Sequence, residues 1–156
     1  VKVINNTIII NSSGRKEHYI GMYFAAGFFG YIGGKGNAGW YKIWGCTNNG
    51  TIEGQYRVAG MVAYVYASGS TAFVDIQFCQ NNGNLTIGRT ADIKEGTIPY
   101  DYCGPFVGYT NSPFTTIKYS IDTGTITKRE GAISANDGLT FVGVVGGTLG
   151  IAGVTC

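Results

Sequence analysis

The stretch "CTNNGTIEG" (46–54) is rewritten twice along the chain, as "CQNNGNLTIG" (79–88) and as "SIDTGTIT" (120–127). A short block of small and apolar residues stands before each copy, and a further block follows the last one. The equivalent position in these four blocks falls at Gly30, Ala63, Gly108 and Gly143, with spacings of 33, 45 and 35 residues. Self-similarity at a period of roughly 20 to 50 residues is typical of solenoids, propellers and other repeat arrays.

The local pattern favours a solenoid over a propeller. The runs "FVDIQF" (73–78) and "TTIKYSI" (115–121) alternate with a period of two, and glycine interrupts every stretch before a helix could complete three turns. Each copy holds two or three such runs, whereas a propeller blade needs about four strands. We therefore expect an all-β, right-handed parallel β-solenoid of about four coils over residues 20–156, preceded by an N-terminal strand segment over residues 1–19. The 33-residue spacing fits either one wide coil or one coil with an excursion.

Stacked coils explain why one turn recurs. Equivalent residues of neighbouring coils lie about 4.8 Å apart, which places Asn48, Asn81 and Asp122 in one column at a coil corner. Buried amides in such a column can bond to backbone and to each other. The glycines two residues later are expected to supply a positive φ at this corner; they are Gly50, Gly83 and Gly124.

The repeated blocks "GFFG" (27–30), "GMVA" (60–63), "PFVG" (105–108) and "TFVG" (140–143) form the other recurrent element. Together with the strand and turn that follow them, they resemble the GLUG-type repeat of large secreted or surface-attached repeat proteins. The resemblance covers residues 20–156, although leucine never fills the second motif position and only the first copy has both glycines. It implies an extracellular structural or adhesive role, and it implies no catalytic residue.

Composition excludes several classes of partner. Charged residues make up 13% of the 156 residues, and the net charge of +2 is not gathered into a basic cluster, so we expect no nucleic-acid partner. The longest apolar, glycine-rich runs are shorter than the roughly 18 to 20 residues that a membrane-spanning helix needs, so we expect no membrane span. With one histidine and no CxxC spacing the chain suggests no metal site, and we expect no cofactor.

Cysteines and sequons favour a secreted or cell-surface protein. Four cysteines are an even set of disulfide candidates, namely Cys46, Cys79, Cys103 and Cys156. Cys46 and Cys79 occupy the same slot in adjacent coils and could pair, and pairing of Cys103 with either one is the main alternative. The chain also carries four N-glycosylation sequons, at Asn5, Asn11, Asn49 and Asn84.

Acidic and aromatic residues are the remaining candidates for a site. Only Asp92, Glu95 and Asp101 lie close together among the acidic residues, in the insertion that lengthens one repeat, and a solvated loop explains them as well as a calcium or sugar site. We therefore expect no enzymatic activity. Trp40 and Trp44 do not recur between copies and are candidates for glycan contact, whereas the column of Tyr31, Tyr64 and Tyr109 is expected to form a structural ladder.

The leading functional prediction is an extracellular structural protein, a fibre- or surface-layer-forming unit that associates with itself end to end. A solenoid exposes strand edges at its ends, and "VKVINNTIIINSS" (1–13) is a strand that could pair with a neighbouring copy. The alternative is an adhesin or glycan-binding module that uses exposed aromatic residues. A polysaccharide-active enzyme is a third hypothesis, which would depend on the acidic insertion.

Overall fold

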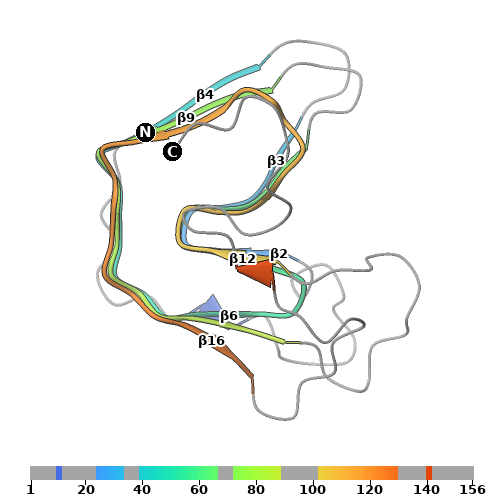
Figure 1. The fold of residues 1–156 in the computed structure, drawn as a ribbon, viewed down its shortest axis with the longest axis vertical. Coiled ribbons are helices and arrows are strands. Elements are labelled where there is room, and N and C mark those ends of the chain that lie inside the picture. The colour runs from blue at the N-terminus through green and yellow to red at the C-terminus, as the bar shows by residue number, and fades with distance from the viewer. Residues whose placement is uncertain are drawn as a thin grey trace, which may run out of the picture.

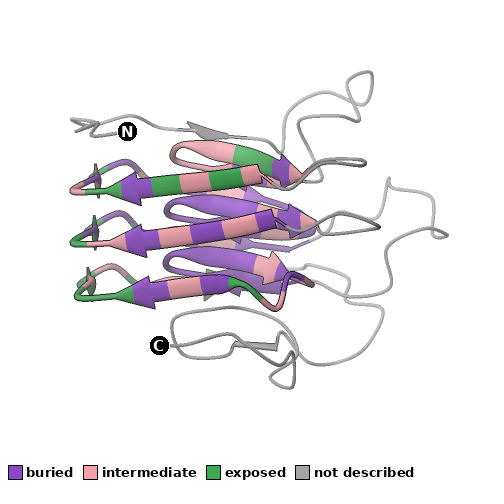
Figure 2. Cartoon of the chain, turned by 90° about the horizontal axis from the view of Figure 1, so that it is seen from above, coloured by how far each residue is buried: buried purple, intermediate pink, exposed green. Residues whose placement is uncertain are grey.

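The computed structural model describes residues 10–11, 24–33, 39–66, 72–88, 102–129 and 140–141. Every secondary-structure element in these ranges is a β-strand. The strands follow the same closed path three times, and Figure 1 shows the three traces superimposed when the molecule is viewed along the stack. Figure 2 shows the same coils side by side as three layers.

Each coil contains five strands. Coil one comprises β2 (Phe24–Ala26), β3 (Phe29–Gly33), β4 (Gly39–Trp44), β5 (Thr47–Asn48) and β6 (Ile52–Gly54). Coil two comprises β7 (Arg57–Ala59), β8 (Val62–Tyr66), β9 (Ala72–Gln77), β10 (Gln80–Asn81) and β11 (Leu85–Ile87). Coil three comprises β12 (Tyr102–Gly104), β13 (Val107–Thr110), β14 (Thr115–Lys118), β15 (Ile121–Asp122) and β16 (Ile126–Lys128). The two remaining strands are β1 (Ile10–Asn11) and β17 (Thr140–Phe141).

All strand pairs are parallel and join equivalent strands of successive coils. The sheets run β1-β6-β11-β16, β5-β10-β15, β2-β7-β12-β17, β3-β8-β13 and β4-β9-β14. The prediction of a parallel β-solenoid is therefore confirmed, and the 33-residue repeat is one wide coil. Within the described ranges three coils each have all five strands, and β1 and β17 add one strand at either end. β1 comes from the predicted N-terminal segment and pairs with β6 of its own chain.

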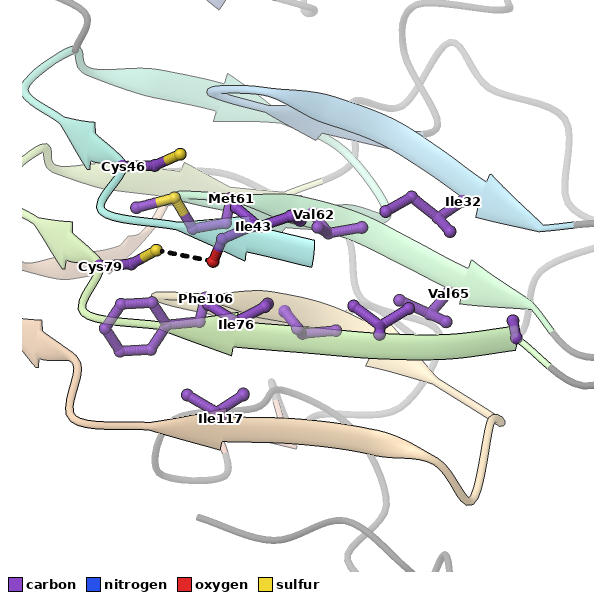
Figure 3. Close-up of a cluster of buried hydrophobic side chains, with 13 residues drawn as sticks. Ile32, Ile43, Cys46, Met61, Val62, Val65, Ile76, Cys79, Phe106 and Ile117 are labelled. Carbon is purple, nitrogen blue, oxygen red and sulfur yellow. Dashed lines mark hydrogen bonds between the residues drawn. The ribbon is translucent and has the colours of Figure 1, made fainter. Parts of the chain in front are cut away.

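Alternating side chains build the core. In β9, Ala72, Val74 and Ile76 are buried inside the coil, while Phe73, Asp75 and Gln77 point outward. The same period of two places Ile43 and Ile117 in line with Ile76, one coil to either side. Figure 3 shows these residues in the larger of two buried clusters, together with Met61 and Phe106.

The repeated blocks at 27–30, 60–63 and 105–108 form a sharp bend between the β2-β7-β12-β17 sheet and the β3-β8-β13 sheet. In Figure 1 the chain turns back on itself between β2 and β3, inside the outline of the coil. The second residue of the block is fully buried in coils two and three, where it is Met61 and Phe106, respectively. A Cβ atom on Gly27 would lie 2.9 Å from Asn48 Oδ1, and one on Gly60 would overlap Asn81 Oδ1. The two recurrent motifs therefore touch across coils one and two, and the bend has no room for a side chain at Gly27 or Gly60.

The prediction that Gly50, Gly83 and Gly124 supply a positive φ is wrong. A positive φ recurs five residues earlier in each coil, at Gly45 (61°), Phe78 (53°) and Tyr119 (52°). Gly83 and Gly124 are required for another reason: a Cβ on Gly83 would overlap the carbonyl oxygen of Gly50, and one on Gly124 would overlap that of Gly83. Close stacking of the coils therefore selects glycine at these two positions.

Candidate functional site

The predicted corner column is a hydrogen-bonded ladder. Asn48 Nδ2 donates to Asn81 Oδ1 at 2.7 Å, and Asn81 Nδ2 donates to Asp122 Oδ1 at 2.8 Å. Each amide also bonds to the backbone of its own turn, as Asn48 Nδ2 does with the carbonyl oxygen of Gly50 at 3.2 Å. Asn48 and Asn81 are buried, whereas Asp122 is exposed. The ladder satisfies buried polar groups, and its position inside the coil gives it a structural role.

The cysteine slot stabilises the same corner. Cys46 Sγ contacts the carbonyl oxygen of Trp44 at 3.6 Å, and Cys79 Sγ contacts that of Gln77 at 3.3 Å. In coil three Ser120 Oγ donates to the carbonyl oxygen of Lys118 at 3.0 Å. Each side chain thus contacts the carbonyl oxygen two residues before it, and the residue between them has the positive φ. This shared contact explains why a cysteine and a serine occupy one slot.

The expected disulfides are absent among the described residues. Cys46, Cys79 and Cys103 are buried and none of them forms a disulfide, and Cys156 lies outside the described ranges. Cys103 belongs to a different buried cluster from Cys46 and Cys79, so the alternative pairing does not form either. Burial raises the pKa of the Cys79 thiol to about 11, and it raises the pKa of Cys103 as well. The thiols of Cys79 and Cys103 are therefore protonated packing groups at neutral pH.

The outer face of the β4-β9-β14 sheet carries the two predicted tryptophans. Trp40 is 69% exposed and stacks on Phe73, with ring centroids 4.1 Å apart and planes 4° from parallel. Phe114 continues this aromatic column on coil three, 4.6 Å from Phe73. Trp40 therefore belongs to an aromatic ladder. The sequence analysis missed this ladder because the equivalent positions in the other two coils hold phenylalanine and not tryptophan. The high exposure of its ring still leaves most of it open to solvent.

Asp75 organises the middle of this face. Its carboxylate accepts a hydrogen bond from Trp44 Nε1 at 3.0 Å, and Gln77 Nε2 donates to both carboxylate oxygens at 2.9 and 3.0 Å. Lys42 lies over the Trp44 ring, 5.1 Å from its centroid. The strand register places Asp75 between Lys42 of coil one and Thr116 of coil three. Trp44, which is 40% exposed, thus holds Asp75 in place as well as facing solvent.

A shallow depression of about 490 Å³ lies between the aromatic column and the row formed by Gln77 and Lys118. We call this depression the trough. Its walls and floor combine aromatic carbon, a carboxylate, an amide, a hydroxyl and an ammonium group. Its lining residues are Trp40, Phe73, Val74, Asp75, Gln77, Pro113, Phe114, Thr116 and Lys118.

The tyrosine column predicted at residues 31, 64 and 109 is present in register. The sequence analysis missed Arg57, which β7 places against it, with the guanidinium carbon 3.7 Å from the Tyr64 ring centroid and 4.6 Å from that of Tyr109. Burial lowers the pKa of Arg57, and it raises the pKa of Tyr64 against the opposing effect of the Arg57 charge. This packing makes the column a structural element, as expected.

The remaining predicted site residues are scattered. Asn49 and Asn84 are exposed, Asn11 lies in β1, and Asn5 falls outside the described ranges. The acidic insertion with Asp92, Glu95 and Asp101 also lies outside them. The part of the chain that the structure describes contains no cluster of three histidine, cysteine or acidic residues that could hold a metal ion. Nor does that part contain a helix long and apolar enough to cross a membrane.

Comparisons of this chain with family models, with curated proteins and with solved structures found no match. The similarity to GLUG-type repeats therefore remains a prediction. The chemistry of the trough is the basis on which a function can be argued.

Proposed function

We propose that this protein is an extracellular saccharide-binding module and that the trough on the β4-β9-β14 face is its binding site. The observation that carries the proposal is the mixture of groups in one depression. Sugars present apolar C–H patches and hydroxyl groups that both donate and accept hydrogen bonds. Aromatic carbon from Trp40 and Phe114 suits the first, and Asp75, Thr116 and Lys118 provide acceptors and donors for the second.

The fixed position of Asp75 supports the proposal. Trp44 and Gln77 hold its carboxylate, so little side-chain freedom would be lost when a hydroxyl group binds to it. The polar groups of the trough disfavour a lipid surface. An extended peptide could not pair with β9, because β4 and β14 already pair with both of its edges. The site therefore suits a saccharide better than either of these ligands.

Calorimetric titration with β-1,4-linked oligosaccharides of glucose, N-acetylglucosamine and xylose tests the proposal. We expect binding of at least one series, with affinity reduced about tenfold or more by Trp40→Ala and by Asp75→Ala, since each removes about 1.4 kcal/mol or more of contact. Tyr31→Ala is the matched control, because Tyr31 is an exposed aromatic residue on the separate β3-β8-β13 sheet. Binding that all three variants leave unchanged would contradict a site in the trough.

End-to-end assembly into a fibre or surface layer is the second candidate. Within the described ranges β15 and β16 pair on one side only, and Asp122 is exposed where its equivalent Asn81 is buried. Such an edge can accept a strand from another copy. Lys128, however, occupies the register position of Gly54 and buried Ile87, and a charge at this position of an edge strand opposes such pairing.

The backbone direction of β16 provides a clean test of this second candidate. Thr125 and Arg129 bond to β11 through the carbonyl oxygen and the amide, respectively, so the Lys128 amide points to the opposite, outer edge. Lys128→Pro removes that donor, whereas Lys128→Ala removes only the charge. If the chain polymerises through this edge, negative-stain images of the native protein should show filaments that Lys128→Pro abolishes and Lys128→Ala retains.

A further inference from the structure

Two strained aromatic residues stand at the corner beside the trough. The positive-φ slot that follows β4, β9 and β14 holds Gly45 in coil one, Phe78 in coil two and Tyr119 in coil three. The three residues are in register, because Gly45 N donates to the Gln77 carbonyl oxygen and Phe78 N donates to that of Lys118. Glycine adopts this conformation freely, whereas a bulky L-residue is an outlier there.

Packing does not account for the two aromatic side chains. Phe78 is 60% exposed and Tyr119 is 73% exposed, and neither belongs to a buried cluster. Among the described residues, the ring contact of each is with the other, at 5.2 Å between centroids and 15° between planes. Gly45 shows that the corner forms without a side chain. The fold would therefore be at least as well served by glycine in all three coils.

Residues held in unfavourable backbone conformations without a packing reason are candidates for function. We call Phe78 and Tyr119 the ridge. It directly follows Gln77 and Lys118, which line the trough, and its exposed side chains stand at the corner where β9 and β14 end. Five residues separate the slot of Trp40 from that of Gly45, which is roughly 16 Å along a strand. That distance exceeds one sugar ring and matches several linked rings.

We propose that the ridge is a second saccharide-contacting element and that the ligand is an extended oligosaccharide running from Trp40 across Asp75 to Tyr119. This inference rests on the proposed function and specifies its ligand class. The stacked rings of the ridge present an exposed aromatic surface to the distal sugar units, and the trough binds the proximal ones. Short saccharides therefore contact the trough alone, and longer ones contact both.

The test compares chain lengths in the native protein and in the double variant Phe78→Gly/Tyr119→Gly. With oligomers of one to six β-1,4-linked units, we expect the affinity of the native protein to rise with length until the ligand spans both elements. The double variant should bind the monomer and dimer as the native protein does, and it should bind the hexamer about tenfold more weakly. Its melting temperature should be equal or higher, because glycine relieves the strain at both corners.

The outcomes separate the two proposals. If the native protein binds short and long oligomers and the double variant binds the hexamer equally well, the ridge is not a contact and only this inference is overturned. If the native protein binds no oligomer of any length, both proposals are overturned. Should the glycine variant fail to fold, Phe78→Asn/Tyr119→Asn replaces it, because asparagine tolerates the left-handed region and also removes both rings. Tyr31→Ala again serves as the control, with hexamer affinity expected to remain unchanged.

Discussion

Coil two and coil three follow the same backbone path in the same register, yet their side chains differ systematically. The glycines that lie against the preceding coil are the same in both: Gly83 and Gly124 each lie against a glycine carbonyl oxygen one coil back. Other positions differ, because coil three has no complete coil after it within the described ranges. Buried Asn81 becomes exposed Asp122, and buried Ile87 becomes exposed Lys128.

The difference separates two requirements that a repeat sequence normally mixes. Backbone stacking demands glycine wherever two coils approach closely, irrespective of burial. Burial demands an apolar or fully hydrogen-bonded side chain only where another coil covers it. Coil three keeps the glycine that backbone stacking demands, but it keeps the buried side chains only in part. This is expected, because no described strand covers its outer side at β15 and β16.

The largest expected effect tests the stacking requirement. Gly83→Ala would drive a Cβ into the Gly50 carbonyl oxygen and should reduce the free energy of unfolding by about 3 kcal/mol or more, since two backbones would have to separate. Gly124→Ala has the same overlap at an exposed corner that can move outward, and should cost less. Chemical denaturation followed by circular dichroism measures both.

Gly30→Ala is the matched control for the glycine series. Its new Cβ would lie 3.5 Å from the Phe24 carbonyl oxygen, an ordinary van der Waals distance. The free energy of unfolding should change by about 1 kcal/mol or less, because the substitution removes backbone entropy from the unfolded chain without overlap. Equal costs at residues 30, 83 and 124 would refute coil stacking as the reason for glycine.

The ladder tests the burial requirement with an intermediate effect. Asn81→Ala removes the acceptor of Asn48 and the donor to Asp122 inside the protein, and should cost about 2 to 3 kcal/mol. Asp122→Ala removes one exposed end of the same ladder, and its cost should be about 1 kcal/mol or less. Urea denaturation of both variants measures the difference. If the two costs were equal, the distinction between coils two and three would not hold at this corner.

The smallest effect concerns pH and the cysteine slot. The pKa of Cys79 is about 11 in the folded chain, against an ordinary value of 9.0, because burial disfavours the thiolate. Below pH 9 both states keep the proton, so stability is unaffected. Between pH 9 and 11 the unfolded chain loses a proton that the folded chain retains, so the free energy of unfolding should fall as pH rises.

Cys79→Ser sharpens this last prediction because Ser120 occupies the same slot in coil three. A serine hydroxyl at position 79 could donate to the Gln77 carbonyl oxygen as Ser120 does to that of Lys118. We expect a folded variant whose stability falls less steeply between pH 9 and 11. The contribution of Cys103, whose pKa is also raised, should remain. An unchanged slope in urea midpoints measured across this range would show that Cys79 does not contribute.

Much of the architecture could be predicted because each coil repeats the same strands and turns. The columns of Asn48, Asn81 and Asp122 and of Tyr31, Tyr64 and Tyr109 follow directly from aligning the copies. The positive-φ slot was assigned to the wrong position, since phenylalanine and tyrosine carry no signal for it and the nearby glycines do. The cysteines were taken for disulfide candidates because spacing alone cannot show that Cys46 and Cys79 each contact a carbonyl oxygen in their own turn.

The sequence by itself determined the repeat period, the register of the coils and the polar corner, because periodicity can be read from the order of the residues alone. Only the tertiary structure decided which contacts give each repeated residue its role. The bend at Gly60 meets Asn81 across the coil, and the trough joins Asp75 to residues of the coils on either side. Such contacts depend on how wide each coil is and on where it bends back, and these follow from packing of the whole stack.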